Sequence, residues 1–294
     1  MKHTKPNWKI PAIIVLAVIL LCQSIDLVRL IYFDGSCRLP VLMYHHFEEE
    51  STKDTVVSSA RFREQITAMA EAGYHAVTIP QVIDYVEQGV PLPEKPVLIT
   101  MDDGYTSNLT IAGPVLEEMG MCATVFVIGA NEGETAYIHS GEPFWQARFS
   151  YEEAAPWVEK GVIDLQSHTF DMHQLASYGF SGRDGVLRMD GESDEAYRQA
   201  IAEDSRLFKE RRGDRVSTPL LALAYPFGYY DAQADELLEE EGYVVTFTID
   251  DRPNRLFPHD ERCLRMLGRI NVTDHLSGEA LVKRLDRYFA GAFQ

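Results

Sequence analysis

The chain has 294 residues, of which 24% are charged and 46% are hydrophobic, an ordinary globular composition with enough length for a large core. The formal net charge is −18. Because the first 30 residues hold four basic side chains and one acidic side chain, residues 31–294 carry −21. Nucleic acid is therefore not an expected partner, since its binding depends on Lys and Arg side chains that neutralise phosphates. The length favours one domain of about 250 residues with an appendage, and the oligomeric state stays open.

The first 30 residues have the pattern of a membrane segment. Three lysines lie within the first nine residues, and an apolar run from Ile10 to Cys22 follows them. No small-residue cleavage pattern follows the run, so we predict an uncleaved signal-anchor at residues 1–30 and a tether at 31–38. The positive residues before the span favour a cytoplasmic N-terminus. Residues 39–294 would then form an extracytoplasmic domain of a single-pass membrane protein. The alternative is a protein that is secreted after signal cleavage.

From residue 39 onward, predicted strands and helices alternate. Strands are predicted at residues 40–44, 76–78, 97–101, 123–128, 161–166, 220–225, 244–249 and 266–272. Helices are predicted at residues 62–73, 79–87, 108–119, 151–160, 194–211, 232–241 and 278–289. Pro156 is expected to restrict where its helix begins. The alternation indicates a parallel α/β domain, most simply a distorted barrel of about seven strands.

Four cysteines are present, and none shows the spacing of a zinc finger or a redox motif. Cys122 precedes an apolar run and is expected to be a small buried hydrophobic residue. Cys37 and Cys263 can pair if the domain is exported, and the sequence leaves that pairing open.

Polar or turn-forming residues follow four of the predicted strands. They are His45 and His46, Asp102 and Asp103, His168 and His173, and the tripeptide Pro226-Phe227-Gly228. The carboxyl ends of parallel strands lie on one rim of a barrel, so these groups are expected to gather there. One aspartate and two histidines suit a divalent metal such as zinc and leave a coordination position open. The second aspartate is then free as a general base, and His45 as a general acid.

Each of these features has an ordinary structural explanation when it is taken alone. A strand-end aspartate pair is more often a turn or a helix cap, and histidines after a strand are more often structural. His168 and His173 are five residues apart, so they need a loop conformation to reach one metal. The prediction of a metal hydrolase rests on the conjunction of four strand ends on one rim.

Three segments resemble the motifs of the polysaccharide deacetylase family (carbohydrate esterase family 4), and the resemblance covers residues 38–294. They are Ile99-Thr100-Met101-Asp102-Asp103-Gly104, Ser167-His168-Thr169-Phe170-Asp171-Met172-His173 and Ala224-Tyr225-Pro226-Phe227-Gly228. The resemblance implies that Asp102 is the catalytic base and that Asp103, His168 and His173 bind a divalent metal, most simply Zn²⁺, with Co²⁺ or Ni²⁺ as alternatives. It also implies that the third segment lines the substrate groove, with Tyr225, Pro226, Phe227 and Gly228 as substrate-binding or oxyanion residues.

Two departures from the common family pattern point to its poly-N-acetylglucosamine deacetylase branch. The five-residue spacing between His168 and His173 is similar to that branch, and no late Leu-His motif for the catalytic acid is present. In that branch the acid motif is permuted to the N-terminus, which Leu42-Met43-Tyr44-His45 resembles, so His45 is the expected acid. Ala224 replaces the usual third-motif arginine, and Arg269 resembles a late arginine of the branch with a supporting role near the base.

The resemblance implies a metal-dependent N-deacetylase that removes acetyl groups from N-acetylated sugars of a cell-surface polysaccharide. The glycan is peptidoglycan or poly-N-acetylglucosamine, and Tyr44, Tyr105, Tyr225 and Phe227 are expected to supply the walls of an open groove. Two alternatives stand beside this prediction. One is a glycan-binding module that has lost catalysis, and the other is a hydrolase of small amides on the same scaffold.

Overall fold

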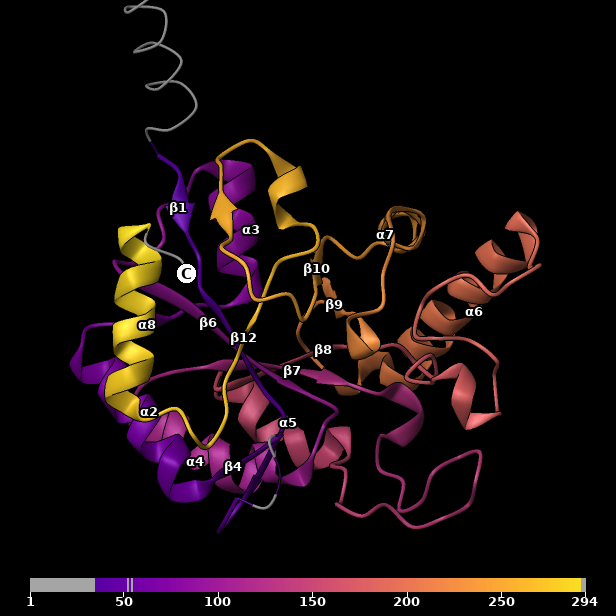
Figure 1. Cartoon of the computed structure of the whole chain (residues 1–294), viewed down its shortest axis with the longest axis horizontal. Helices are drawn as coiled ribbons and strands as arrows, with labels where there is room; N and C mark the ends of the chain where they lie inside the picture. Colours follow the sequence, from indigo (N-terminus) through magenta and orange to yellow (C-terminus); the bar gives the residue numbers. More distant parts are fainter. Residues whose placement is uncertain (1–34, 52, 54, 292–294) are drawn as a thin grey trace, which may run out of the picture.

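The computed structural model describes residues 35–51, 53 and 55–291. Its framework is a curved sheet of parallel strands, with helices along the outside (Figure 1). The strands of the main path, in spatial order, are β10 (Val245–Phe247), β9 (Ala222–Ala224), β8 (Ile163–Ser167), β7 (Ala123–Val127), β6 (Pro96–Asp102), β2 (Val41–Tyr44) and β12 (Ile270–Asn271). A further strand, β5 (His75–Ala76), pairs with β6. These strands are mostly runs of buried residues, as expected for a parallel sheet covered on both faces.

The two ends of this strand order approach each other. Leu267, just before β12, forms a parallel bridge to Phe247 at the end of β10. The Leu267 N–H donates to the carbonyl of Thr246, and the Leu267 carbonyl accepts from the N–H of Thr248. The predicted strand at 266–272 is therefore divided, because Leu267 bonds to β10 and the β12 residues bond to β2. The architecture is a parallel-strand half-barrel with a distorted closing edge.

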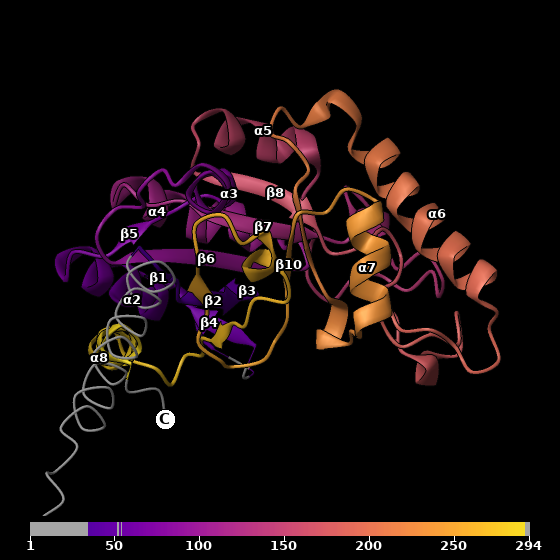
Figure 2. The same ribbon diagram turned by 90° about the horizontal axis from the view of Figure 1, so that it is seen from above.

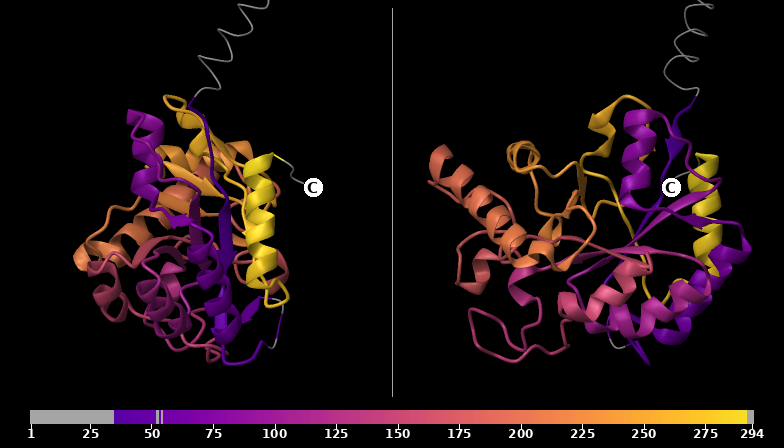
Figure 3. Two further views of the ribbon diagram at one scale, coloured as in Figure 1. Left: turned by 90° about the vertical axis from the view of Figure 1, so that its left-hand side faces the viewer. Right: turned by 180° about the vertical axis from the view of Figure 1, so that it is seen from behind.

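Seven α-helices lie within the described part of the chain. They are α2 (Ser59–Glu71), α3 (Ile79–Gln88), α4 (Gly113–Glu118), α5 (Tyr151–Glu159), α6 (Asp194–Arg212), α7 (Ala232–Glu240) and α8 (Gly278–Ala290). Helices α2 and α8 lie side by side against one part of the sheet, and α6 and α7 lie at the opposite end of the molecule (Figures 1 and 2). The view from behind shows the same separation (Figure 3, right). All seven were predicted from the sequence, with ends that differ by a few residues.

The short elements mostly lie in segments that the sequence left as loops. They are the antiparallel pair β1 (Cys37–Arg38) and β11 (Arg255–Leu256), the parallel pair β3 (His46–Glu48) and β4 (Val56–Ser58), a π-type turn at Asn108–Ala112, and 3-10 turns at Gly129–Asn131, Ala176–Tyr178, Gly213–Arg215, Pro226–Gly228 and Glu261–Leu264. Strands this short carry too few residues for an alternating pattern to be visible.

Pro156 does not set the start of α5, contrary to expectation. The helix begins at Tyr151, and Pro156 lies inside it. The start is set by Ser150 and Glu153, which form a reciprocal cap. The N–H of Glu153 donates to Ser150 Oγ at 3.2 Å, and the N–H of Ser150 donates to Glu153 Oε2 at 2.7 Å.

Two expectations about the ends of the domain have different outcomes. Cys37 and Cys263 are free thiols, so the pairing left open by the sequence is not formed. The signal-anchor predicted at residues 1–30 lies outside the described residues. Within the part of the chain that is described, no helix combines the length and the apolar character that a membrane crossing requires.

Candidate metal centre and active site

The strand register brings the chemically distinctive residues to one rim of the sheet. Asp102 pairs with Phe126, Val127 with Ser167, and Ser167 with Leu223, so β6, β7, β8 and β9 end close together. Asp103 follows β6, and His168 follows β8. The rim predicted from the sequence is therefore present.

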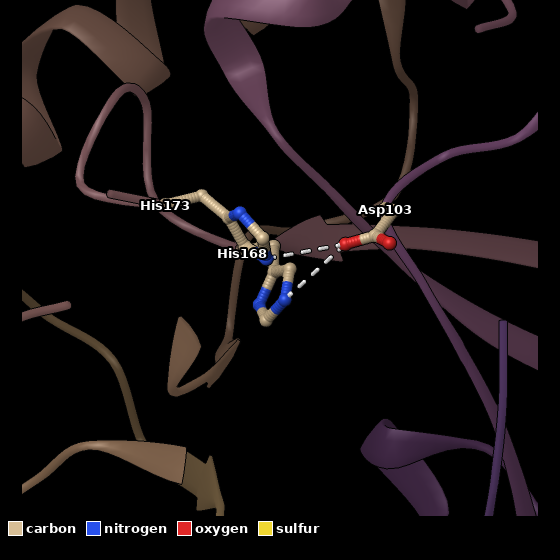
Figure 4. Close-up of side chains that lie close together, drawn as sticks. All are labelled: Asp103, His168 and His173. Carbon is tan, nitrogen blue, oxygen red and sulfur yellow. Dashed lines mark ion pairs between the residues drawn. The ribbon is translucent and has the colours of Figure 1, made fainter. Parts of the chain in front are cut away.

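Asp103, His168 and His173 form a compact cluster. One potential ligand atom from each lies within 4.8 Å of the others. Asp103 Oδ1 is 3.7 Å from His168 Nε2 and 3.4 Å from His173 Nε2. Figure 4 shows the two imidazole rings next to each other, both on the same side of the Asp103 carboxylate and both facing its Oδ1. The loop after β8 thus supplies the conformation that two histidines five residues apart need in order to converge.

The donor set of this cluster fits a divalent metal. Asp103 Oδ1 is buried and has no hydrogen-bond partner among the described residues, although it faces two imidazole nitrogens. His168 Nδ1 is 2.8 Å from the carbonyl oxygen of Ala224. A carbonyl only accepts, so Nδ1 carries the proton and the Nε2 lone pair is directed at Asp103. This second hydrogen bond is the arrangement that orients metal-binding histidines in general.

The charge states of the cluster also suit metal binding. Burial lowers the pKa of His173 to about 4 despite the neighbouring Asp103 carboxylate, so the ring is neutral at pH 7. For Asp103, burial alone would raise the pKa, but His173, Arg148 and the other nearby bases together hold it well below its usual range. A neutral imidazole and an ionised carboxylate are the forms that bind zinc.

The loop that carries His173 is held by a buried carboxylate on α6. Asp204 accepts the backbone N–H groups of Phe170 and Asp171, both at 2.8 Å. Thr169 has a left-handed backbone with φ of 68°, and its N–H donates to Ser167 Oγ at 3.1 Å. These contacts form the bend that returns His173 toward β8. Sequence reasoning did not select Asp204, because nothing in the pattern of α6 distinguishes it from the other acidic residues of that helix.

Asp102 and Asp103 are adjacent, yet they face different partners. Asp103 has φ of 74°, a conformation that a non-glycine residue adopts only when its surroundings impose it. Gly104, with φ of 70°, continues the same turn. This turn directs the Asp103 carboxylate to the histidines, while Asp102 belongs to β6 and is 2% exposed.

Asp102 is held by a buried bidentate ion pair with Arg269. Arg269 Nη1 donates to Asp102 Oδ1 at 2.7 Å, and Nη2 donates to Oδ2 at 2.8 Å. The guanidinium is fully buried, and its Nε donates to the carbonyl of Thr248 at 2.8 Å. Burial by itself raises the pKa of Asp102, but the charges of Arg269, His168 and His45 outweigh it, so the pKa lies below its usual value. Arg269 thus orients this carboxylate, to which the methyl side chain of Ala224 cannot hydrogen-bond.

His45 lies on the solvent side of Asp102. Its Nε2 is 3.9 Å from Asp102 Oδ2, and its side chain is 23% exposed. The neighbouring His46 is turned away: its Nδ1 is 2.8 Å from Ser107 Oγ, and its ring packs against Tyr105 with centroids 4.8 Å apart. Of the two adjacent histidines, His45 is therefore the one beside the aspartates.

Two of the four aromatic residues expected in the groove walls do not lie there. Tyr225 is fully buried, its hydroxyl donates to Asp235, and its ring stacks on Tyr230. Tyr44 is also fully buried, and its hydroxyl donates to Gln65. Both side chains point into the core because successive strand residues alternate between the two faces of the sheet.

The remaining third-motif residues lie at the rim. Pro226 is buried, and Phe227 has φ of 56°, which places its ring 4.2 Å from the ring of His173. Gly228, with φ of 73°, has the side chain of Ile249 where a Cβ would lie. Tyr105 lines a pocket of about 480 Å³ beside the cluster, as do Asp103 and His173.

Arg148 is a site residue that the sequence did not indicate. It belongs to the long segment between β7 and α5, predicted only as an irregular loop. Its guanidinium stacks on Tyr105, with Cζ 3.6 Å from the ring centroid, and it lines the same pocket as Asp103. No local pattern marks it, because its position depends on a backbone bridge between Arg148 and Tyr105.

Removing one histidine of the cluster tests it as a metal centre. His168→Ala is expected to lower zinc affinity by a factor of about 100 or more, because it removes one of three protein ligands. The measurement is the metal content after dialysis against limiting zinc, with circular dichroism to establish folding. His75→Ala, an exposed histidine elsewhere on the surface, is the control. Equal zinc content in His168→Ala and the unaltered protein would exclude this cluster as the metal site.

The fold and the rim define an α/β protein with a candidate metal centre next to a buried carboxylate. The sequence matches the family described as "Polysaccharide deacetylase" over residues 89–246, more than half of the chain. The chain belongs to the polysaccharide deacetylase family.

Individual relatives agree with this family. The chain is 26% identical over 243 residues to YxkH of Bacillus subtilis, whose name also places it among polysaccharide deacetylases, and the match covers 83% of this chain and 74% of the relative. It is 25% identical over 224 residues to the poly-beta-1,6-N-acetyl-D-glucosamine N-deacetylase of Escherichia coli K12, covering 71% of this chain. That match spans about a third (33%) of the Escherichia coli protein.

Solved structures share the architecture. IcaB from Ammonifex degensii superposes with a TM-score of 0.67 at 25% identity, covering 87% of this chain and 95% of that chain. The de-N-acetylase from Aggregatibacter actinomycetemcomitans superposes with a TM-score of 0.71 at 18% identity, covering 85% of this chain and all of that one (100%). The second likeness concerns the fold alone.

Proposed function

We propose that this protein is a metal-dependent N-deacetylase that hydrolyses the acetamido groups of a cell-surface polysaccharide. One observation carries the proposal: two adjacent aspartates have separate environments. Asp103 faces His168 and His173, and Asp102 faces Arg269 and His45. Amide hydrolysis at a metal needs both a metal ligand and a proton acceptor at the same place.

Asp103, His168 and His173 would hold the metal. When bound, a divalent ion supplies Lewis acidity, which polarises the acetyl carbonyl and acidifies a water molecule. Zinc suits two imidazoles and one carboxylate, and Co²⁺ or Ni²⁺ suits the same donors. The identity of the ion is part of the proposal and is tested by the metal that restores activity after chelation.

The chain's own residues carry the proton transfers. Asp102 accepts the proton of the attacking water, and its ion pair with Arg269 keeps it ionised and fixed in orientation. His45 donates a proton to the leaving amine nitrogen, which leaves poorly without one. The backbone N–H of Phe227, on the turn beside His173, is the proposed donor to the developing oxyanion. The products are acetate and a glucosamine unit.

The substrate we favour is a polymer of N-acetylglucosamine. The support is the spacing of His168 and His173, the position of His45 near the N-terminus and the likeness to proteins named as poly-N-acetylglucosamine deacetylases. Peptidoglycan is the other glycan in the proposal.

We also propose that residues 1–30 anchor the protein in the cell membrane with the domain outside the cytoplasm. That orientation rests on the lysines that precede the apolar run.

Acetate release tests the activity directly. The metal-loaded protein is expected to release acetate from N-acetylglucosamine oligomers, from poly-N-acetylglucosamine or from peptidoglycan, and a chelator is expected to stop the release. Added zinc should restore it, because the effect of the chelator is loss of the ion held by the cluster. Enzymatic measurement of acetate, with each glycan in turn, also ranks the substrates. No release from any glycan by protein of full metal content would overturn the proposed function.

His45→Ala tests the assignment of the acid. It is expected to lower kcat about 100-fold or more, since general acid catalysis contributes about 10²–10⁴-fold. Metal content should not change, because His45 is not one of the three clustered ligands. The measurement is kcat on an oligomer together with zinc content. His46→Ala is the matched control, since His46 contacts Ser107 and Tyr105 instead of the aspartates. Full activity in His45→Ala would show that another group protonates the amine.

A further inference from the structure

Arg148 is built rigidly into the site, although none of the motif segments contains it. The Phe149 N–H donates to the carbonyl of Gly104 at 3.2 Å, and the Thr106 N–H donates to the carbonyl of Ala147 at 2.9 Å. These bonds flank the bridge between Arg148 and Tyr105, so the arginine is fixed beside the turn that carries the aspartates. Its guanidinium lies on the Tyr105 ring, which restricts the side chain further.

Two nitrogen atoms of this guanidinium donate to no acceptor within the described part of the chain. Nε and Nη1 of Arg148 are buried and have no hydrogen-bond partner among the described residues. No carboxylate of the described chain lies within ion-pair distance of Arg148, and Asp171, which lines the same pocket, is paired with His139 at 2.8 Å. Buried charged donors without acceptors are costly, which indicates that a ligand supplies the acceptor.

The charge balance favours an anionic ligand. Asp103 is near enough for Arg148 to help lower its pKa, but no hydrogen bond joins the two side chains. If Asp103 binds a divalent metal, its negative charge is neutralised there. The charge of Asp102 is likewise neutralised by Arg269. Arg148 then remains as a cation beside a metal, and the flat fork of a guanidinium matches the two oxygens of a carboxylate.

We propose that Arg148 forms a carboxylate-binding subsite in the pocket beside the metal centre. The carboxylate has two possible sources in the proposed reaction: the acetate that is released, or an acidic substituent on the sugar. This inference rests on the proposed deacetylase function for its ligands. Arg148 is a ligand-binding and specificity residue in this role, and it takes no part in proton transfer.

The test is calorimetric titration of sodium acetate into zinc-loaded protein, with the zinc content of each sample measured first. Arg148→Met is expected to bind acetate about tenfold more weakly than the unaltered protein. The acetate affinity of Arg148→Lys is expected to lie between those of Arg148→Met and the unaltered protein, because lysine retains the charge without the planar fork. Arg255→Met is the matched control, since Arg255 also lies over an aromatic ring, that of Phe257, outside the pocket.

Kinetics then separate the two sources. If acetate is the ligand, Arg148→Met weakens product inhibition by acetate about tenfold and changes kcat/KM by the same factor on neutral oligomers and on oligomers with a lactyl carboxylate. If the sugar carries the carboxylate, the same variant lowers kcat/KM about tenfold more on oligomers with a lactyl carboxylate than on neutral oligomers. Both results support the subsite.

Acetate affinity in Arg148→Met equal to that of the unaltered protein, at equal zinc content, together with the same change in kcat/KM on both oligomers, would overturn the subsite. If Arg148→Met does not fold, the acetate titration of Arg148→Lys replaces it as the test of the subsite. Acetate affinity in Arg148→Lys equal to that of the unaltered protein would then overturn the subsite. The titration needs no turnover. A protein that binds acetate through Arg148 but releases none from any glycan would therefore refute the proposed function and leave the subsite standing.

Discussion

Asp102→Asn is expected to lower kcat about a thousand-fold while the metal content stays unchanged. An amide cannot accept the proton of the attacking water, and general base catalysis contributes about 10²–10⁴-fold. The three clustered ligands remain, because Asp102 faces Arg269 and His45. The measurements are kcat on an N-acetylglucosamine oligomer and zinc content. Loss of metal in this variant, or turnover near that of the unaltered protein, would contradict the division of roles between Asp102 and Asp103.

Asp102→Asn also leaves the buried guanidinium of Arg269 without its anion, so stability must be controlled. Breaking one side of a buried ion pair costs about 3–5 kcal/mol in the free energy of unfolding. The double variant Asp102→Asn with Arg269→Gln removes both charges, and it is expected to recover part of that stability in chemical denaturation. Turnover should remain lost in the double variant. If the double variant recovered both stability and turnover, the activity lost in Asp102→Asn would have come from unfolding.

Arg269→Met is expected to move the acid limb of the pH–rate profile to higher pH. Burial alone raises the pKa of Asp102, and the charge of Arg269 is the largest of the influences that lower it. Without Arg269 the pKa of this carboxyl therefore rises. Only the ionised base accepts a proton, and the ionised fraction falls as the pH drops through the pKa, so activity is lost at a higher pH than before. The measurement is kcat/KM as a function of pH at full metal content.

The same substitution is expected to destabilise the fold by about 3–5 kcal/mol, because Asp102 becomes a buried charge without a partner. Arg183→Met is a matched control. Arg183 is also buried and forms an ion pair with Glu192, but it does not contact the aspartates. Arg183→Met should lose stability without a shift of the acid limb. An unshifted limb in Arg269→Met would show that this arginine does not set the pKa of the base.

The helices and most main-path strands were predictable because each carries its own signal. β6 is a run of seven buried residues, and the six that precede Asp102 are apolar apart from Thr100. Such a pattern is local and survives any arrangement of the other strands. The short β1, β3, β4 and β11 were not predicted, since each pairs with a partner that only the folded chain brings near.

Side-chain direction was harder to predict than strand position. Tyr44 and Tyr225 stand at or next to strand ends, where a groove wall is plausible from the sequence, yet both are fully buried. Tyr105 lies in the turn after β6 and does line the pocket. The face to which a strand-end residue points depends on the pleat and register of the whole sheet, which a single segment does not reveal.

The amino-acid sequence by itself determined the alternation of strands and helices, the family motifs and the set of residues at the strand ends. Tertiary structure decided how these residues divide their roles. Asp103 is turned to the histidines by a left-handed backbone conformation, and Asp102 is paired with Arg269, 167 residues away along the chain. Tertiary structure also placed the guanidinium of Arg148 over the ring of Tyr105. The physical reason is that residue type and spacing are local, whereas burial, ion pairing and backbone strain depend on contacts between segments far apart in sequence.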